Sequence, residues 1–149
     1  MISTLIFDLD ETLLYEEASI QNTFEVTCKH VQERYEIDCN VMAKTIRLTA
    51  RARWRAGPVH DYCQSVGISS PEGLAGTFRG HDPYLNILYK WVPDFRRESW
   101  IEALGKNGIE DKEFGRELAE IFIHERRKHH ILFPETESVL RYLQGIYRL

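Results

Sequence analysis

The sequence of 149 residues has few cysteines and no long apolar stretch. Its three cysteines, Cys28, Cys39 and Cys63, are irregularly spaced and form no CxxC pair, which argues against a disulfide framework or a zinc site. No stretch approaches the roughly 18 apolar residues that a membrane span requires, so no membrane partner is expected. The N-terminus lacks the basic segment and apolar core of a signal peptide, which favours a cytoplasmic location.

The sequence also lacks an excess of positive charge. It has 19 Lys and Arg residues against 23 Asp and Glu residues, for a formal net charge of -4. This is not the basic footprint of a nucleic-acid-binding protein, so no nucleic acid is expected as a partner. The hydrophobic content of 43% and the charged content of 28% are typical of one globular domain.

The most informative stretch lies near the N-terminus, where an apolar run over residues 4–7 leads directly into Asp8 and Asp10. A continuous apolar run predicts a strand buried on both faces, as in a parallel sheet. Such sheets place their chemistry just past the carboxyl ends of the strands. Side chains two residues apart in an extended backbone point to the same side. Asp8 and Asp10 are therefore expected to face one small volume.

Two carboxylates in one small volume suit phosphoryl transfer. They repel each other unless a cation neutralises them, and Mg²⁺ prefers carboxylate, carbonyl, water and phosphate oxygens. One aspartate can then attack phosphorus and form an acyl-phosphate. The other can protonate the leaving oxygen and later deprotonate the water that clears the intermediate. A solvated acidic turn is the alternative interpretation of the same pair.

The stretch Ile6-Phe7-Asp8-Leu9-Asp10-Glu11-Thr12-Leu13 resembles the first motif of the haloacid dehalogenase-like hydrolases, in which apolar residues precede Asp-x-Asp-x-Thr/Val. The resemblance implies that Asp8 is the nucleophile and a Mg²⁺ ligand. It implies that Asp10 is the general acid/base and binds Mg²⁺ through its backbone carbonyl, and that Thr12 braces the loop. Since the leaving group of a dehalogenase needs no proton, an aspartate at position 10 favours phosphate chemistry within the family.

The rest of the sequence predicts mainly helices. Apolar residues that recur every three or four positions indicate helices over about 16–36, 38–57, 59–66, from 111 onward and over 134–146. A helix is expected to start at Asp82-Pro83, and Asp94, directly after Pro93, is expected to cap another. Only Tyr147-Arg148-Leu149 again resembles the start of a strand.

This layout resembles the subclass of the family whose all-helical cap is inserted between the first and second motifs. The resemblance implies an α/β, Rossmann-like core that is only partly present, in residues 1–14 and 131–149, with a helical cap over residues 15–130. Relatives continue with a phosphate-binding Ser or Thr, a Lys and an acidic pair, and this sequence ends before them. We therefore expect a truncated chain that is inactive alone, or a fragment that forms a homo-oligomer or exchanges strands through its incomplete core.

A basic stripe is the second candidate site. Lys44, Arg47, Arg51 and Arg55 are spaced three, four and four positions apart, which places them on one helix face. In a cap such a stripe would face an anionic substrate. A solvated basic face that is paired with acidic neighbours is the simpler interpretation.

The sequence thus predicts a Mg²⁺-dependent phosphomonoester hydrolase that acts on a small phosphorylated metabolite through an aspartyl-phosphate. Phosphomutase, phosphonatase and dehalogenase activities are the alternatives within the family. A non-catalytic helical module for interaction or assembly is the alternative from another class. A receiver-like phosphoacceptor fits less well, because its aspartate is not followed by an acid/base two residues later and no large helical insertion follows its first strand.

Overall fold

A computed structural model describes residues 2–149 of the chain. Met1, the first residue of the predicted core segment 1–14, lies outside the described residues. Helices make up about two thirds of the chain. The seven helices in this range are α1 (Glu16–Tyr35), α2 (Cys39–Arg55), α3 (His60–Val66), α4 (Ser70–Ala75), α5 (Pro83–Lys106), α6 (Lys112–Arg126) and α7 (Thr136–Gln144). None of them is long and apolar enough to cross a membrane.

The predicted α/β, Rossmann-like core is wrong for the residues that the structure describes, because residues 2–149 contain no strand and no sheet. The apolar run before the two aspartates makes only an isolated parallel bridge between Thr4 and Arg148. There the Leu5 N–H donates to the Arg148 carbonyl at 2.9 Å, and the Arg148 N–H donates to the Ser3 carbonyl at 3.0 Å. Ile6 is 94% exposed. A strand pair without further neighbours has nothing to cover its faces or extend its ladder.

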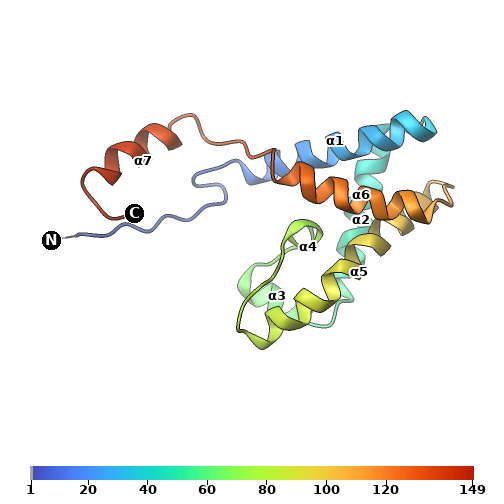
Figure 1. Cartoon of the computed structure of the whole chain (residues 1–149), viewed down its shortest axis with the longest axis horizontal. Coiled ribbons are helices and arrows are strands. Elements are labelled where there is room, and N and C mark those ends of the chain that lie inside the picture. The colour runs from blue at the N-terminus through green and yellow to red at the C-terminus, as the bar shows by residue number, and fades with distance from the viewer. Residues whose placement is uncertain (1) are drawn as a thin grey trace.

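Helices α1 to α6, here called the helical body, enclose one continuous hydrophobic core (Figure 1). Helices α1 and α5 each pack against both α2 and α6, and α4 lies against α2, α5 and α6. Phe24 of α1, Trp100 of α5 and Phe122 of α6 are fully buried at the centre. The ring centroid of Phe122 lies 4.8 Å from that of Phe24 and 6.0 Å from that of Trp100.

One predicted helix boundary is wrong, because α5 continues unbroken through Pro93. A proline inside a helix removes one N–H hydrogen bond and crowds the preceding turn. On either side of this proline, Leu88, Val92 and Phe95 are at most 2% exposed. Burial of this apolar face favours helix on both sides of Pro93, so Asp94 lies within α5 and caps no new helix.

Residues 2–14 and 131–149, here called the terminal arm, lie together and apart from the helical body (Figure 1). No residue of the arm that the structure describes belongs to the hydrophobic core. The two halves of the arm meet where the chain enters and leaves the body. There Leu14 forms an antiparallel bridge with Leu132, and the Tyr15 N–H donates to the Ile131 carbonyl at 2.8 Å. The Tyr15 ring also packs on the Phe133 ring, with centroids 3.7 Å apart.

Candidate active site between the arm and the helical body

Asp8 and Asp10 lie in a tight loop of the terminal arm that closes on itself. The Leu14 N–H donates to the Leu9 carbonyl at 3.2 Å, and the Glu11 N–H donates to the Leu14 carbonyl at 2.9 Å. Glu11 has a φ of 54°, in the left-handed region that most residues avoid. The turn brings the loop back to the first residue of α1 and so places the two aspartates beside the helical body.

The side chains of the two aspartates are both exposed. The Thr12 hydroxyl donates to the Asp8 carboxylate at 3.3 Å, which is a contact suited to holding that side chain in place. Partial burial, followed by the negative charges of Glu16, Glu72 and Asp8, raises the pKa of Asp10 above its ordinary value. A raised pKa favours the protonated carboxyl, which is the form that a general acid needs.

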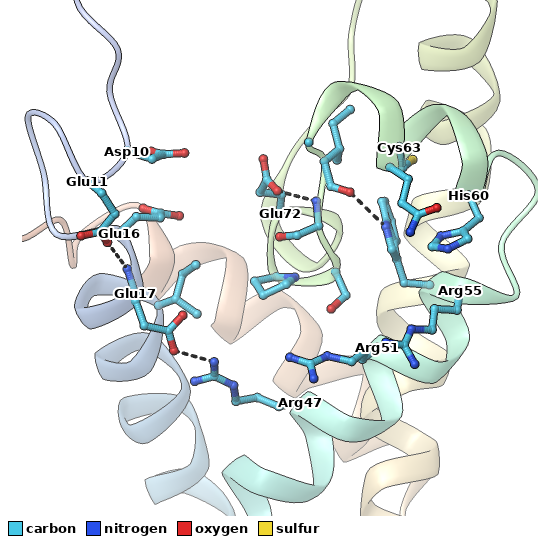
Figure 2. A pocket seen from close by; sticks show the side chains of 18 residues that line it. Asp10, Glu11, Glu16, Glu17, Arg47, Arg51, Arg55, His60, Cys63 and Glu72 are labelled. Atoms are coloured by element: carbon cyan, nitrogen blue, oxygen red, sulfur yellow. Dashed lines mark hydrogen bonds and ion pairs between the residues drawn. The ribbon is translucent and has the colours of Figure 1, made fainter.

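A cavity of about 610 Å³ opens between this loop and the helical body. In Figure 2, Arg51 and Arg55 lie across the space from Asp10, whereas Arg47 lies beside Glu17. Acidic side chains come from the loop and the start of α1, and basic side chains come from α2. The acidic group is Asp10, Glu11, Glu16 and Glu17, and the basic group is Arg47, Arg51 and Arg55. Helices α3 and α4 complete the wall with His60 and Glu72.

Two of the acidic residues are committed to ion pairs. Both carboxylate oxygens of Glu16 accept hydrogen bonds from Arg126, at 2.6 and 2.7 Å. The Glu17 carboxylate accepts from Arg47 at 2.6 Å, and Arg47 also donates to the Gln21 side-chain oxygen at 2.7 Å. These contacts join the start of α1 to the end of α6 and to α2, so they hold the entrance of the helical body in place.

Two other acidic residues serve local backbone groups. The Glu11 carboxylate accepts from the Glu17 N–H at 3.0 Å. The Glu72 carboxylate accepts from the Ser69 N–H and completes a capping box at the start of α4. The S-x-x-E pattern of Ser69 to Glu72 is visible in the sequence, but it indicates only that a helix begins there. Nothing in the sequence indicates that His60 and Glu72 line the same cavity as Asp10.

The four residues of the predicted basic stripe have different surroundings in the structure. Lys44 is exposed and does not line the cavity. Arg47 is paired with Glu17, as the simpler interpretation of the stripe expects. Arg51 and Arg55 line the cavity, and neither forms an ion pair or a side-chain hydrogen bond with any residue in the range 2–149.

The loop has the donor types that a hard cation such as Mg²⁺ accepts. The loop offers two exposed carboxylates, and their exposure leaves room for water and a substrate phosphate to complete a coordination sphere. Partial burial is the first cause of the raised pKa of Asp10, and the nearby negative charges that add to it are charges that a cation would offset. Over residues 2–149, no group of three or more His, Cys, Asp and Glu side chains is arranged to hold a metal ion.

Among curated proteins, the chain is similar over 91% of its length to an enzyme of the phosphatase class. That relative is the protein named phosphoserine phosphatase of Thermus thermophilus, and the two are 33% identical over 138 residues. A shorter similarity, 34% identity over 58 residues, is to the human protein named prolyl 3-hydroxylase 3 and covers 39% of this chain. The chain spans 51% of the length of the first protein and 8% of the second. No family model matches the chain, and no solved structure matches it.

Proposed function

We propose that this chain carries the catalytic aspartates of a Mg²⁺-dependent phosphomonoester hydrolase of the haloacid dehalogenase-like type. The observation that carries the proposal is the loop from Asp8 to Thr12 at the edge of a charged cavity. Similarity to a phosphatase over 91% of the chain supports it independently of that geometry. The name of this relative makes phosphoserine the first substrate to assay.

In the proposed reaction an Asp8 carboxylate oxygen attacks phosphorus, and the bond from phosphorus to the ester oxygen breaks. Asp10 donates its proton to the departing oxygen and is left ionised. Asp10 then accepts a proton from the water that attacks the aspartyl-phosphate, and inorganic phosphate leaves. The Thr12 hydroxyl orients Asp8 throughout. Mg²⁺, held by the Asp8 carboxylate and the Asp10 backbone carbonyl, would supply positive charge against the phosphate.

In this proposal residues 15–130 act as a cap. The helical body contributes the wall of the cavity that faces Asp10, and the arm contributes Asp10 itself, with Asp8 two residues away in the same loop but outside the lining. We also propose that turnover needs the further phosphate-binding groups that the family resemblance implies, because the chain spans about half of its phosphatase relative. The 149 residues alone are therefore expected to bind phosphomonoesters without hydrolysing them at an appreciable rate.

A non-catalytic assembly module remains the second candidate. The observation that favours it is the exposed apolar surface of the arm, where Ile6 is 94% exposed and Tyr142 is 70% exposed. Surfaces of this kind are common at protein interfaces. The assembly hypothesis predicts that the chain associates with itself. It also predicts that the Asp8→Asn substitution has no effect on phosphomonoester hydrolysis.

Phosphate release from phosphoserine in the presence of Mg²⁺ tests the hydrolase. It is measured for the chain alone and for a fusion that supplies the half of the Thermus relative outside the match. We expect activity in the fusion only, its complete loss in Asp8→Asn, and a loss of about 10²-fold to 10⁴-fold in Asp10→Asn. A fusion that keeps its activity after Asp8→Asn contradicts the mechanism. Activity of the 149 residues alone contradicts the requirement for further groups.

A further inference from the structure

We propose that Arg51 and Arg55 form a subsite for a second anionic group of the substrate, at the opposite side of the cavity from Asp10. The substrates would then be phosphomonoesters that carry a carboxylate or a second phosphate. The inference rests on the proposed hydrolase for the position of the first phosphate beside Asp8. Beyond that function, the inference names the residues that select among phosphomonoesters and the chemical group that they recognise.

Most of the charged side chains that line the cavity already have a hydrogen-bond or ion-pair partner within the chain. Glu16 and Glu17 are held by arginines, and the Glu11 and Glu72 carboxylates accept backbone N–H groups. The remaining charged side chains in the lining are Asp10 on one side and Arg51 and Arg55 on the other, none with a hydrogen-bond or ion-pair partner among residues 2–149. A ligand that enters the cavity therefore meets Asp10 on one side and the two unpaired arginines on the other.

Arg51 and Arg55 are one turn apart on α2, so their side chains leave the same helix face. Two like charges in this arrangement repel each other, and an anion bound between them would remove that cost. The planar guanidinium group also presents parallel N–H donors that match the two oxygens of a carboxylate or phosphate. Arg47, one turn earlier on the same helix, illustrates the alternative, because its charge is already neutralised by Glu17.

The helix that carries the two arginines is fixed in place. Ala50 is 1% exposed and Trp54 is 5% exposed, and both belong to the hydrophobic core of the body. The Trp54 ring packs on Trp91 and Phe95, with centroids 5.5 and 5.1 Å away. Cations on a rigid element lose little freedom when they bind a ligand, so they discriminate between ligands better than cations on a mobile loop.

The cavity has the volume that a small metabolite needs. Its 610 Å³ lie within the range of about 300–1,000 Å³ that is usual for small-molecule sites. Figure 2 shows Asp10 at one edge of the space and the two arginines at another, with Glu72 drawn between these edges. A short molecule would fit if one end carried a phosphate bound through the proposed Mg²⁺ near Asp10 and the other end carried a second anionic group that faces the arginines.

Isothermal titration calorimetry of the chain with Mg²⁺ tests the subsite without any need for turnover. Phosphoserine and phosphoethanolamine are suitable probes because they differ only in a carboxylate. We expect phosphoserine to bind at least about tenfold more tightly, the effect of one charge-assisted contact. The double variant Arg51→Gln/Arg55→Gln should lose this preference. The matched control Lys44→Gln, on the same helix outside the cavity, should keep it.

Ethane-1,2-diol bisphosphate, tested in the same way, decides whether the second group is a carboxylate or a phosphate. The proposal is overturned if the wild type binds phosphoserine and phosphoethanolamine equally or binds neither. It is also overturned if the double variant, with its circular dichroism unchanged, retains the preference. The two proposals can fail separately. If the chain prefers phosphoserine only when both arginines are present, but the fusion with the Thermus half hydrolyses nothing, the subsite is supported and the hydrolase is contradicted. If the fusion hydrolyses phosphoserine but the chain does not prefer phosphoserine over phosphoethanolamine, the hydrolase is supported and the subsite is contradicted.

Discussion

The helical body and the terminal arm differ most in where their apolar side chains lie. In the body, Phe24, Trp100 and Phe122 are fully buried and contact one another across three helices. In the arm, Ile6 is 94% exposed and Tyr142 is 70% exposed. The body has a complete core, whereas the apolar groups of the arm are largely uncovered.

The candidate active site draws on both regions, and each contributes something different. The arm supplies the two aspartates on a loop that is exposed to solvent. The body supplies the opposite wall of the cavity on helices that its core holds rigid. The two regions are therefore expected to have different roles. Substitutions in the arm should change the reaction, and substitutions on α2 should change which substrate binds.

The largest expected effect distinguishes the helical body from the terminal arm directly. Replacing Phe24 by alanine should lower the free energy of unfolding by about 3–5 kcal/mol, because the cavity left behind cannot be filled by rigid neighbours. Replacing Ile6 by alanine should change it by no more than about 0.5 kcal/mol, because the side chain is already in water. Urea unfolding followed by tryptophan fluorescence measures both. An Ile6→Ala effect as large as that of Phe24→Ala would mean that the arm is covered in solution.

The next effect concerns the junction between the regions. Glu16 and Arg126 are only 17% and 14% exposed, so their ion pair is poorly screened by water. A double-mutant cycle with Glu16→Gln and Arg126→Met should give a coupling energy of about 2 kcal/mol. Glu113 and Arg116 form the matched control, at 2.9 Å but 87% and 51% exposed. Their coupling should not exceed about 0.5 kcal/mol.

Equal coupling energies in the two cycles would mean that neither burial nor the link between two helices strengthens the Glu16–Arg126 pair. Loss of the Glu16 pair should also loosen the entrance of the body. Hydrogen exchange at the first turn of α1 should then increase, while exchange at the buried centre of α5 should stay unchanged.

Sequence reasoning located the helices better than the rest of the molecule. The apolar repeat through Phe24 and Cys28 predicts α1, because a helix buries one face and that face is visible as a spacing. The apolar run before Asp8 predicted a buried strand, but a strand is buried only if other strands are present to cover it. Pro93 was treated as a boundary because local preference alone disfavours helix there, and tertiary packing decided otherwise.

The site shows the same division between local and distant information. The motif around Asp8 and Asp10 could be recognised because its residues are adjacent in the sequence. The spacing of the stripe predicted that Arg51 and Arg55 share a face with Arg47. Which of these arginines is neutralised depends on Glu17, which lies on another helix, so only the structure could separate the paired one from the two open ones.

The smallest expected effect tests the end of the body that lies farthest from the arm. Asp111 accepts hydrogen bonds from the Tyr35 hydroxyl at 2.6 Å and from the Phe114 N–H at 2.9 Å, and it pairs with Arg34 at 3.0 Å. These contacts, the Tyr35 hydrogen bond first, lower the pKa of Asp111 below its ordinary value of 3.8. The unfolded chain therefore takes up this proton more readily than the folded chain does.

The stabilisation from Asp111 is thus fully present above pH 4 and is lost as the pH falls through the lowered pKa of the folded state. Asp111→Asn should be less stable than the wild type at pH 7, and the difference should shrink below pH 4. Tyr35→Phe should make the stabilisation from Asp111 smaller and raise the pH at which it is fully lost, because it removes the largest cause of the lowered folded-state pKa. Urea unfolding at pH 7, 4 and 3 measures the difference, and a gap that stays constant over this range would show that Asp111 acts only through its shape.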